Sequence, residues 1–68
     1  GAVSDAGVAL QLCKAVMEGA RFTCLANVKY FDDDVYAMTV RREFEIVFQE
    51  NMPKIDSAIA VVEQRLAR

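Results

Sequence analysis

Apolar residues in the first third of the chain recur at the spacing of one helix face. Successive members of the set are three or four residues apart, and further apolar side chains widen the stripe. Ser4 is a typical N-cap and Gly19 a typical helix stop, so a helix is predicted over Asp5 to Glu18. The stripe is broad enough to need cover on more than one side. Its members are Ala6, Ala9, Cys13, Val16 and Ala20.

Two later segments alternate with a period of two, which favours strands. Apolar residues occupy most even positions of 21–31 and again of 35–48, with Asp32 to Asp34 between them. A three-residue loop pairs residues whose numbers add to 66, which places Arg21 opposite Glu45. The pattern predicts a β-hairpin between two helices, an α+β fold in the order helix, strand, strand, helix.

A helical interpretation of the same region remains open. Tyr36, Val40, Phe44 and Val47 also form a helical stripe over 33–51, with Arg41 and Glu45 as a pair one turn apart. This alternative predicts an all-α bundle. In both interpretations Pro53 suits the first turn of a final helix that continues to Ala67.

Length and composition indicate a single domain with little interior. The chain has 68 residues, of which 54% are hydrophobic, and a domain this small buries only about 60% of the surface of its unfolded form. No apolar run approaches the roughly 20 residues of a membrane-spanning helix. Self-association into a dimer or larger homo-oligomer is the simplest use of the apolar excess, and we expect 1–68 to be an oligomerisation domain.

The expected interface combines the second strand with the final helix. If that strand runs to Phe48, its end extends past the first strand as an unpaired apolar edge, which a second copy would cover. The expected interface residues are Phe44, Ile46, Phe48, Ile59, Val62 and Leu66. Arg42 interrupts the apolar face. It either extends to solvent or pairs with a carboxylate, or contacts an anion or partner together with Arg41.

Recognisable catalytic, metal and cofactor patterns are missing from the sequence. There is no histidine, and Cys13 and Cys24 have no further ligands of zinc-site spacing. The Asp32 to Asp34 run lacks the alternating pattern of a calcium loop and is interpreted as a solvated turn. The two cysteines are expected to be buried as small apolar residues, with a redox pair as the alternative.

These observations favour a non-enzymatic, self-associating protein interaction module with an assembly, adaptor or regulatory role and no cofactor. The alternative is a small dimeric regulator that binds nucleic acid, although a net charge of -2 argues against phosphate as the main partner. No signal peptide is present in these residues, so a cytoplasmic location is expected, and a removed leader is left open.

Overall fold

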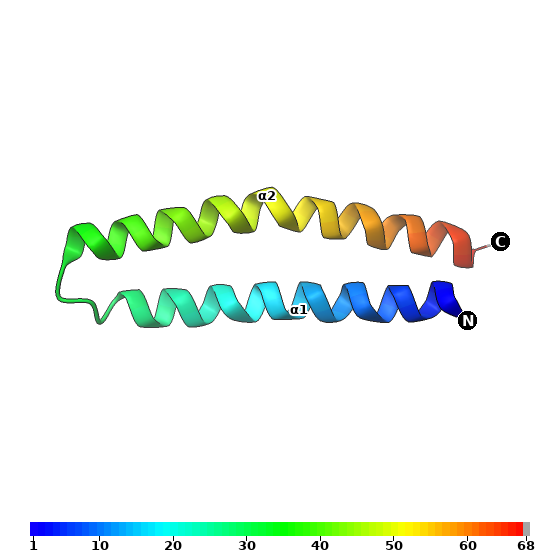
Figure 1. Ribbon diagram of the computed structural model, residues 1–68, viewed down its shortest axis with the longest axis horizontal. Coiled ribbons are helices and arrows are strands. Elements are labelled where there is room, and N and C mark those ends of the chain that lie inside the picture. Colours follow the sequence, from blue (N-terminus) through cyan, green and yellow to red (C-terminus); the bar gives the residue numbers. More distant parts are fainter. Residues whose placement is uncertain (68) are drawn as a thin grey trace.

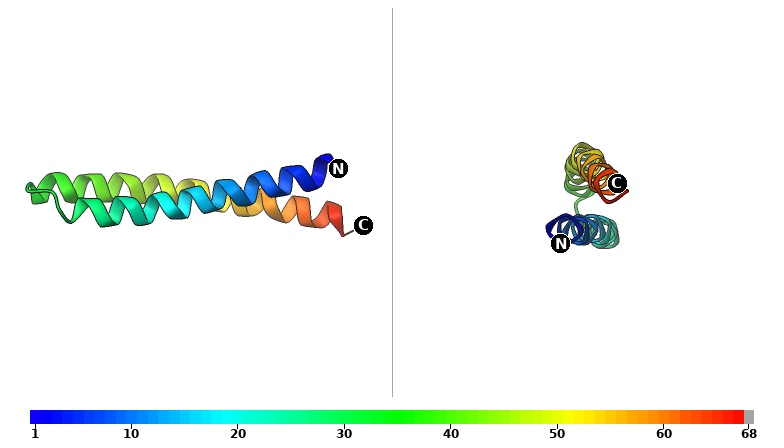
Figure 2. Two further views of the ribbon diagram at one scale, coloured as in Figure 1. Left: turned by 90° about the horizontal axis from the view of Figure 1, so that it is seen from below. Right: turned by 90° about the vertical axis from the view of Figure 1, so that its right-hand side faces the viewer.

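Two long antiparallel helices form the whole of the described chain. In the computed structural model, which describes residues 1–67, α1 spans Ala2–Val28 and α2 spans Asp34–Leu66. The helices lie side by side, joined at one end by a short loop, and both termini lie at the other end (Figure 1). Figure 2 shows that they cross at a shallow angle. The molecule is therefore a helical hairpin, as in the all-α alternative.

The predicted β-hairpin is wrong, because 21–28 and 34–48 are helical and the described residues contain no strand. The apolar even positions of the second segment include Tyr36, Val40, Phe44 and Phe48, which are four residues apart. Every second member of an alternating pattern lies four residues from the next, so the alternation also contained the stripe of one helix face. Six of the nine positions between the members of this stripe hold residues of high helix propensity: Ala37, Met38, Arg41, Arg42, Glu43 and Glu45.

Residues that usually disfavour helix interiors are accommodated by local hydrogen bonds. The hydroxyl of Thr23 donates to the carbonyl of Gly19 at 3.2 Å, and the amide of Asn27 donates to the carbonyl of Thr23 at 2.9 Å. In α2, the hydroxyl of Thr39 donates to the Val35 carbonyl at 2.9 Å. Each polar group thus bonds one turn back along its own helix instead of competing with the backbone.

The helix ends differ from the predicted ones. Gly1 is the N-cap of α1, Ser4 lies inside its first turn, and Gly19 does not stop the helix. Asp33 caps α2, because its Oδ1 accepts a hydrogen bond from the backbone N–H of Tyr36 at 3.0 Å. Pro53 lies inside α2 and does not begin a new helix. Its missing N–H removes one bond of the ladder, and α2 is bowed near its yellow segment (Figure 1).

The contact between the helices follows a repeat of seven residues. On α1 a series of half-buried positions that ends at the buried Val28 alternates at spacings of four and three, as in an antiparallel coiled coil, and Leu25 is a further half-buried residue beside it. The members of the series are Val3, Gly7, Leu10, Lys14, Met17, Arg21, Cys24 and Val28. The facing positions of α2 include Phe44, Phe48, Asn51, Ile55, Ala58 and Val62. Gly7 allows a close approach, since a Cβ there would lie 3.1 Å from Cγ1 of Val62.

Two ion pairs across this contact fix its register. Nε of Arg21 donates to Oε1 of Glu45 at 2.7 Å, and Nζ of Lys14 lies 2.9 Å from Oδ1 of Asp56. The pairing of Arg21 with Glu45 is the one predicted for the β-hairpin. It survives because any antiparallel hairpin around the same loop brings together residues whose numbers have a similar sum.

Candidate assembly surface

The hairpin leaves nearly all of its apolar side chains in contact with water. Val28 is the only fully buried hydrophobic residue among those described, at 4% exposure. The radius of gyration is 15.8 Å, against about 11 Å for a compact domain of this length. The accessible surface is 5249 Å², about 960 Å² more than expected for a compact monomer of 7.6 kDa. One hairpin therefore lacks a core of its own.

The outer surface of α1 is apolar over most of its circumference. Val8, Leu12 and Val16 are 61%, 62% and 70% exposed. Only four of the 27 residues of α1 are charged, and two of these, Lys14 and Arg21, pair across the helix contact. A helix that is apolar on nearly all sides is usually buried on nearly all sides. The stripe predicted from the sequence lies on this outer surface, not against α2: Ala6, Ala9, Cys13, Val16 and Ala20 are all exposed.

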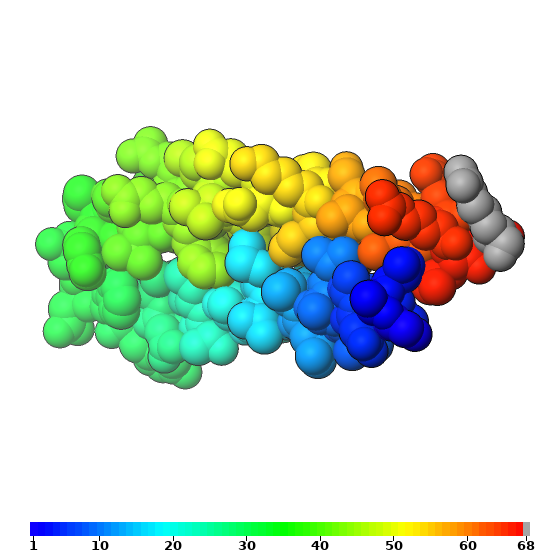
Figure 3. Space-filling view, turned by 45° about the vertical axis from the view of Figure 1, so that its right-hand side comes forward, coloured from blue at the N-terminus to red at the C-terminus, as the bar shows by residue number. Residues whose placement is uncertain are grey.

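Two apolar grooves lie along one side of the hairpin, between α1 and α2. The larger has a volume of about 560 Å³ and is lined from α1 by Leu10, Cys13 and Val16 and from α2 by Ile55 and Ala58, among others. The smaller, of about 270 Å³, lies nearer the termini. It is lined by Ala2, Val3, Ala6, Val61, Val62 and Arg65. In the space-filling view, the blue and orange segments of the two helices meet along their length (Figure 3).

The residues predicted as the interface fall into two groups. Phe44, Phe48, Ile59 and Val62 are half-buried within the hairpin, and the rings of Phe44 and Phe48 stack with centroids 6.4 Å apart. The guanidinium of Arg21 lies 5.6 Å from the centroid of the Phe48 ring. Ile46 and Leu66 remain about half exposed. The sequence pattern thus placed the interface on α2, but four of the six predicted interface side chains already pack within the hairpin.

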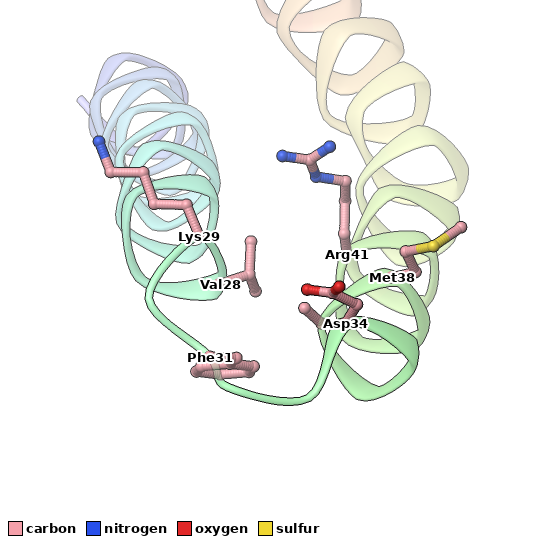
Figure 4. A pocket seen from close by; sticks show the side chains of 7 residues that line it. Val28, Lys29, Phe31, Asp34, Met38 and Arg41 are labelled. Atoms are coloured by element: carbon pink, nitrogen blue, oxygen red, sulfur yellow. The ribbon is translucent and has the colours of Figure 1, made fainter.

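Arg41 and Arg42 are exposed on α2 and form neither of the two ion pairs found in residues 1–67. Arg41 and Lys29 line a pocket at the loop end of the hairpin, with Val28 and Phe31 between them (Figure 4). The carboxylate of Asp34 lies in the same pocket. It would oppose an anion there. The anion or partner contact predicted for the two arginines stays a prediction.

The two cysteines occupy different surroundings. Both are free, Cys24 is half-buried near the contact with α2, and Cys13 is exposed beside the larger groove. The predicted burial of Cys13 is therefore wrong for a single hairpin.

Residues 1–67 contain no group of three or more His, Cys, Asp or Glu side chains placed to hold a metal ion. Neither helix, within those residues, is long and apolar enough to cross a membrane.

The described residues form a helical hairpin whose first helix exposes apolar side chains, and comparison with known families gives a match. The family model described as formiminotransferase-cyclodeaminase matches residues 1–46, which include α1, the loop and the first third of α2. The match covers more than half of the chain, and the chain belongs to this family. No curated protein and no solved structure matches it. Because the family model is that of an enzyme-associated domain, the expected non-enzymatic character of this chain stays a prediction.

Proposed function

We propose that this hairpin is the assembly element of a formiminotransferase-cyclodeaminase-type protein, and that it acts by associating with a second copy through its apolar surface. In this role the chain supplies helical surface on which a larger unit is built. The observation that carries the proposal is the exposure of large apolar side chains along α1, with Val28 the one buried residue among 1–67.

The size of the exposed surface supports association as the outcome. A stable interface buries about 800 Å² on each partner, which is close to the surface that this hairpin exposes in excess of a compact monomer of its mass. One side of the molecule measures 53 by 16 Å, so side-by-side packing of two hairpins covers an area of that order. Four helices around a shared core would then satisfy the apolar residues of both copies.

Light scattering across a concentration series tests this function. We expect the mass of a dimer or larger assembly at micromolar concentrations, with helical circular dichroism, and dissociation on dilution. A helical chain with the mass of one copy at every concentration would contradict the proposal. A mass that changes with reductant would instead favour the redox role of the cysteines.

The family match favours a second candidate, in which the assembled chain takes part in the chemistry that the family name describes. That name specifies transfer of a formimino group and ring closure with loss of ammonia. A coupled assay for ammonia release from a formimino-bearing substrate tests this candidate. Ammonia release that rises with the fraction of assembled protein would support it, and assembled protein without release would leave only the assembly function.

A further inference from the structure

The side of the hairpin that carries the two apolar grooves has a different composition on each helix. The α1 edge of this side consists of exposed positions spaced by four and three residues, all of them apolar and none charged. They are Ala2, Ala6, Ala9, Cys13, Val16 and Ala20, here called the α1 seam. The corresponding edge of α2 includes the charged residues Lys54 and Arg65, which also line the grooves.

We infer that a second copy of this chain packs on this side with its α1 antiparallel to the first α1, seam against seam. The inference rests on the proposed function and specifies the partner helix and its direction. Pairing like helices places the uncharged seam against itself. The alternative, α1 against the partner's α2, would bury Lys54 and Arg65 against apolar side chains, at a high cost for an unpaired charge.

The seam has a register in which it matches itself about a two-fold axis. When residue numbers across the interface add to 22, Ala2 faces Ala20, Ala6 faces Val16, and Ala9 faces Cys13. The largest side chain of the seam then meets a methyl group, and the small residues at the other positions let the two backbones approach closely. Both charged residues of α1 that do not pair with α2, Asp5 and Glu18, lie outside the seam.

The grooves beside the seam supply the rest of the contact. The larger groove is lined almost entirely by apolar atoms of Leu10, Met17 and Ile55, among others, and it runs directly beside Cys13 and Val16. A ridge of side chains from a second hairpin fits such a groove in the way that helices pack in bundles. The face is thus built by both helices and does not depend on the small residues alone.

Disulfide cross-linking between two distinguishable chains tests the inference. Both chains carry Cys24→Ala. The first keeps Cys13, and the second carries Cys13→Ala with Ala9→Cys and a short tag that separates the products by mass. After mixing, equilibration and mild oxidation, we expect the linked heterodimer between positions 13 and 9 to be the main product, at least fivefold above any other.

Two control chains make the result specific. Ala60→Cys places the thiol on the exposed outer side of α2 and is expected not to link to Cys13. Ala58→Cys reports on packing of α1 against the partner's α2. Two results overturn the inference while the proposed function stands. One is a disulfide between position 9 of one chain and position 58 of the other. The second is a disulfide between position 60 and Cys13 that forms as readily as the one between position 9 and Cys13. A helical chain that stays monomeric before oxidation overturns both the inference and the proposed function.

Discussion

The two helices of this hairpin differ in how they meet water. α1 has four charged residues among 27, and most of its exposed residues are apolar or small. The polar exceptions are Ser4, Asp5, Gln11, Glu18, Thr23 and Asn27. α2 has ten charged residues among 33, and all but Glu45 and Asp56, which pair with α1, are exposed without an ion pair to α1. A single hairpin gives both helices the same amount of cover, one neighbour each. The difference in composition is expected if α1 has further neighbours and α2 fewer, as the proposed assembly requires.

This asymmetry also explains why a chain with so small a core can have a defined structure. Helix propensity and two cross-helix ion pairs set the shape of the hairpin, but isolated helices draw most of their stability from packing of an apolar face. In this hairpin only part of the apolar surface of α1 packs against α2. Association would provide the missing burial, and the folded hairpin and the assembly would then be thermodynamically linked.

The largest expected effect comes from placing the same charge on each helix in turn. Ala9→Lys puts an ammonium group in the middle of the α1 seam, and Ala60→Lys puts it on the outer side of α2, at an equally exposed alanine. Removal of an unpaired charge from water costs several kcal/mol. The dissociation constant of the assembly should rise by about 100-fold for Ala9→Lys, and should change less than about twofold for Ala60→Lys. Light scattering or sedimentation measures both.

Equal effects from the two lysine substitutions would remove the distinction between the helices. Helical circular dichroism at low concentration serves as the control for folding, because both positions are exposed in the single hairpin.

A smaller effect separates the two glycines inside α1. Alanine is favoured over glycine in a helix interior by about 0.5 to 1 kcal/mol. Nothing lies within 4 Å of a Cβ at position 19, whereas a Cβ at position 7 would meet Val62 at 3.1 Å. Gly19→Ala should therefore stabilise the chain by about that amount, and Gly7→Ala by clearly less or not at all. Urea unfolding at one protein concentration measures the difference. A larger gain at position 7 would show that the helices are not in close contact there.

The ion pair of Arg21 with Glu45 should contribute modestly to stability. Both side chains are about one third exposed, so solvent screens the pair. A double-mutant cycle with Arg21→Met and Glu45→Gln should give a coupling free energy of about 0.5 to 1 kcal/mol in urea unfolding. No coupling would mean that this contact does not hold the register of the hairpin.

The smallest effect is a pH dependence from Lys14. Its hydrogen bond and attraction to the Asp56 carboxylate raise the pKa of Lys14 above the ordinary value of 10.5. The pair therefore stabilises the fold fully below pH 10.5, and this contribution is lost as the pH rises through the higher pKa of the folded state. Thermal unfolding across this alkaline range should decline less steeply in Lys14→Met than in the parent chain. Identical slopes would show that Lys14 is unpaired in solution.

Much of the hairpin could be anticipated from the sequence, although its secondary structure was not. The chain reverses close to the predicted turn at Asp32 to Asp34, but the loop spans 29–33 and Asp34 already belongs to α2. The antiparallel return and the pairing of Arg21 with Glu45 follow from the position of this loop. The strand interpretation failed because residues four apart are also an even number apart. Val, Tyr and Phe then favoured strands locally, while the Arg and Glu residues between them favoured helix.

The proposed assembly surface was only partly predictable for a related reason. The seam of Ala6, Ala9, Cys13 and Val16 could be recognised from its spacing, but spacing does not specify which neighbour covers a face. The hairpin brings Leu10, Met17 and Arg21 toward α2. Which face of α1 packs against α2 depends on the ion pairs and on the close approach at Gly7. Both features can be seen only when the two helices are placed together.

The two native cysteines allow the most direct test of the difference between the helix surfaces. In the single hairpin Cys13 is exposed and Cys24 is half-buried, so a maleimide should label Cys13 first at concentrations where the chain is monomeric. As the concentration rises into the range of assembly, we expect the labelling rate of Cys13 to fall at least tenfold and below that of Cys24. A Cys13 that remains the faster thiol at every concentration, in a protein shown to be assembled, would contradict burial of α1 in the interface.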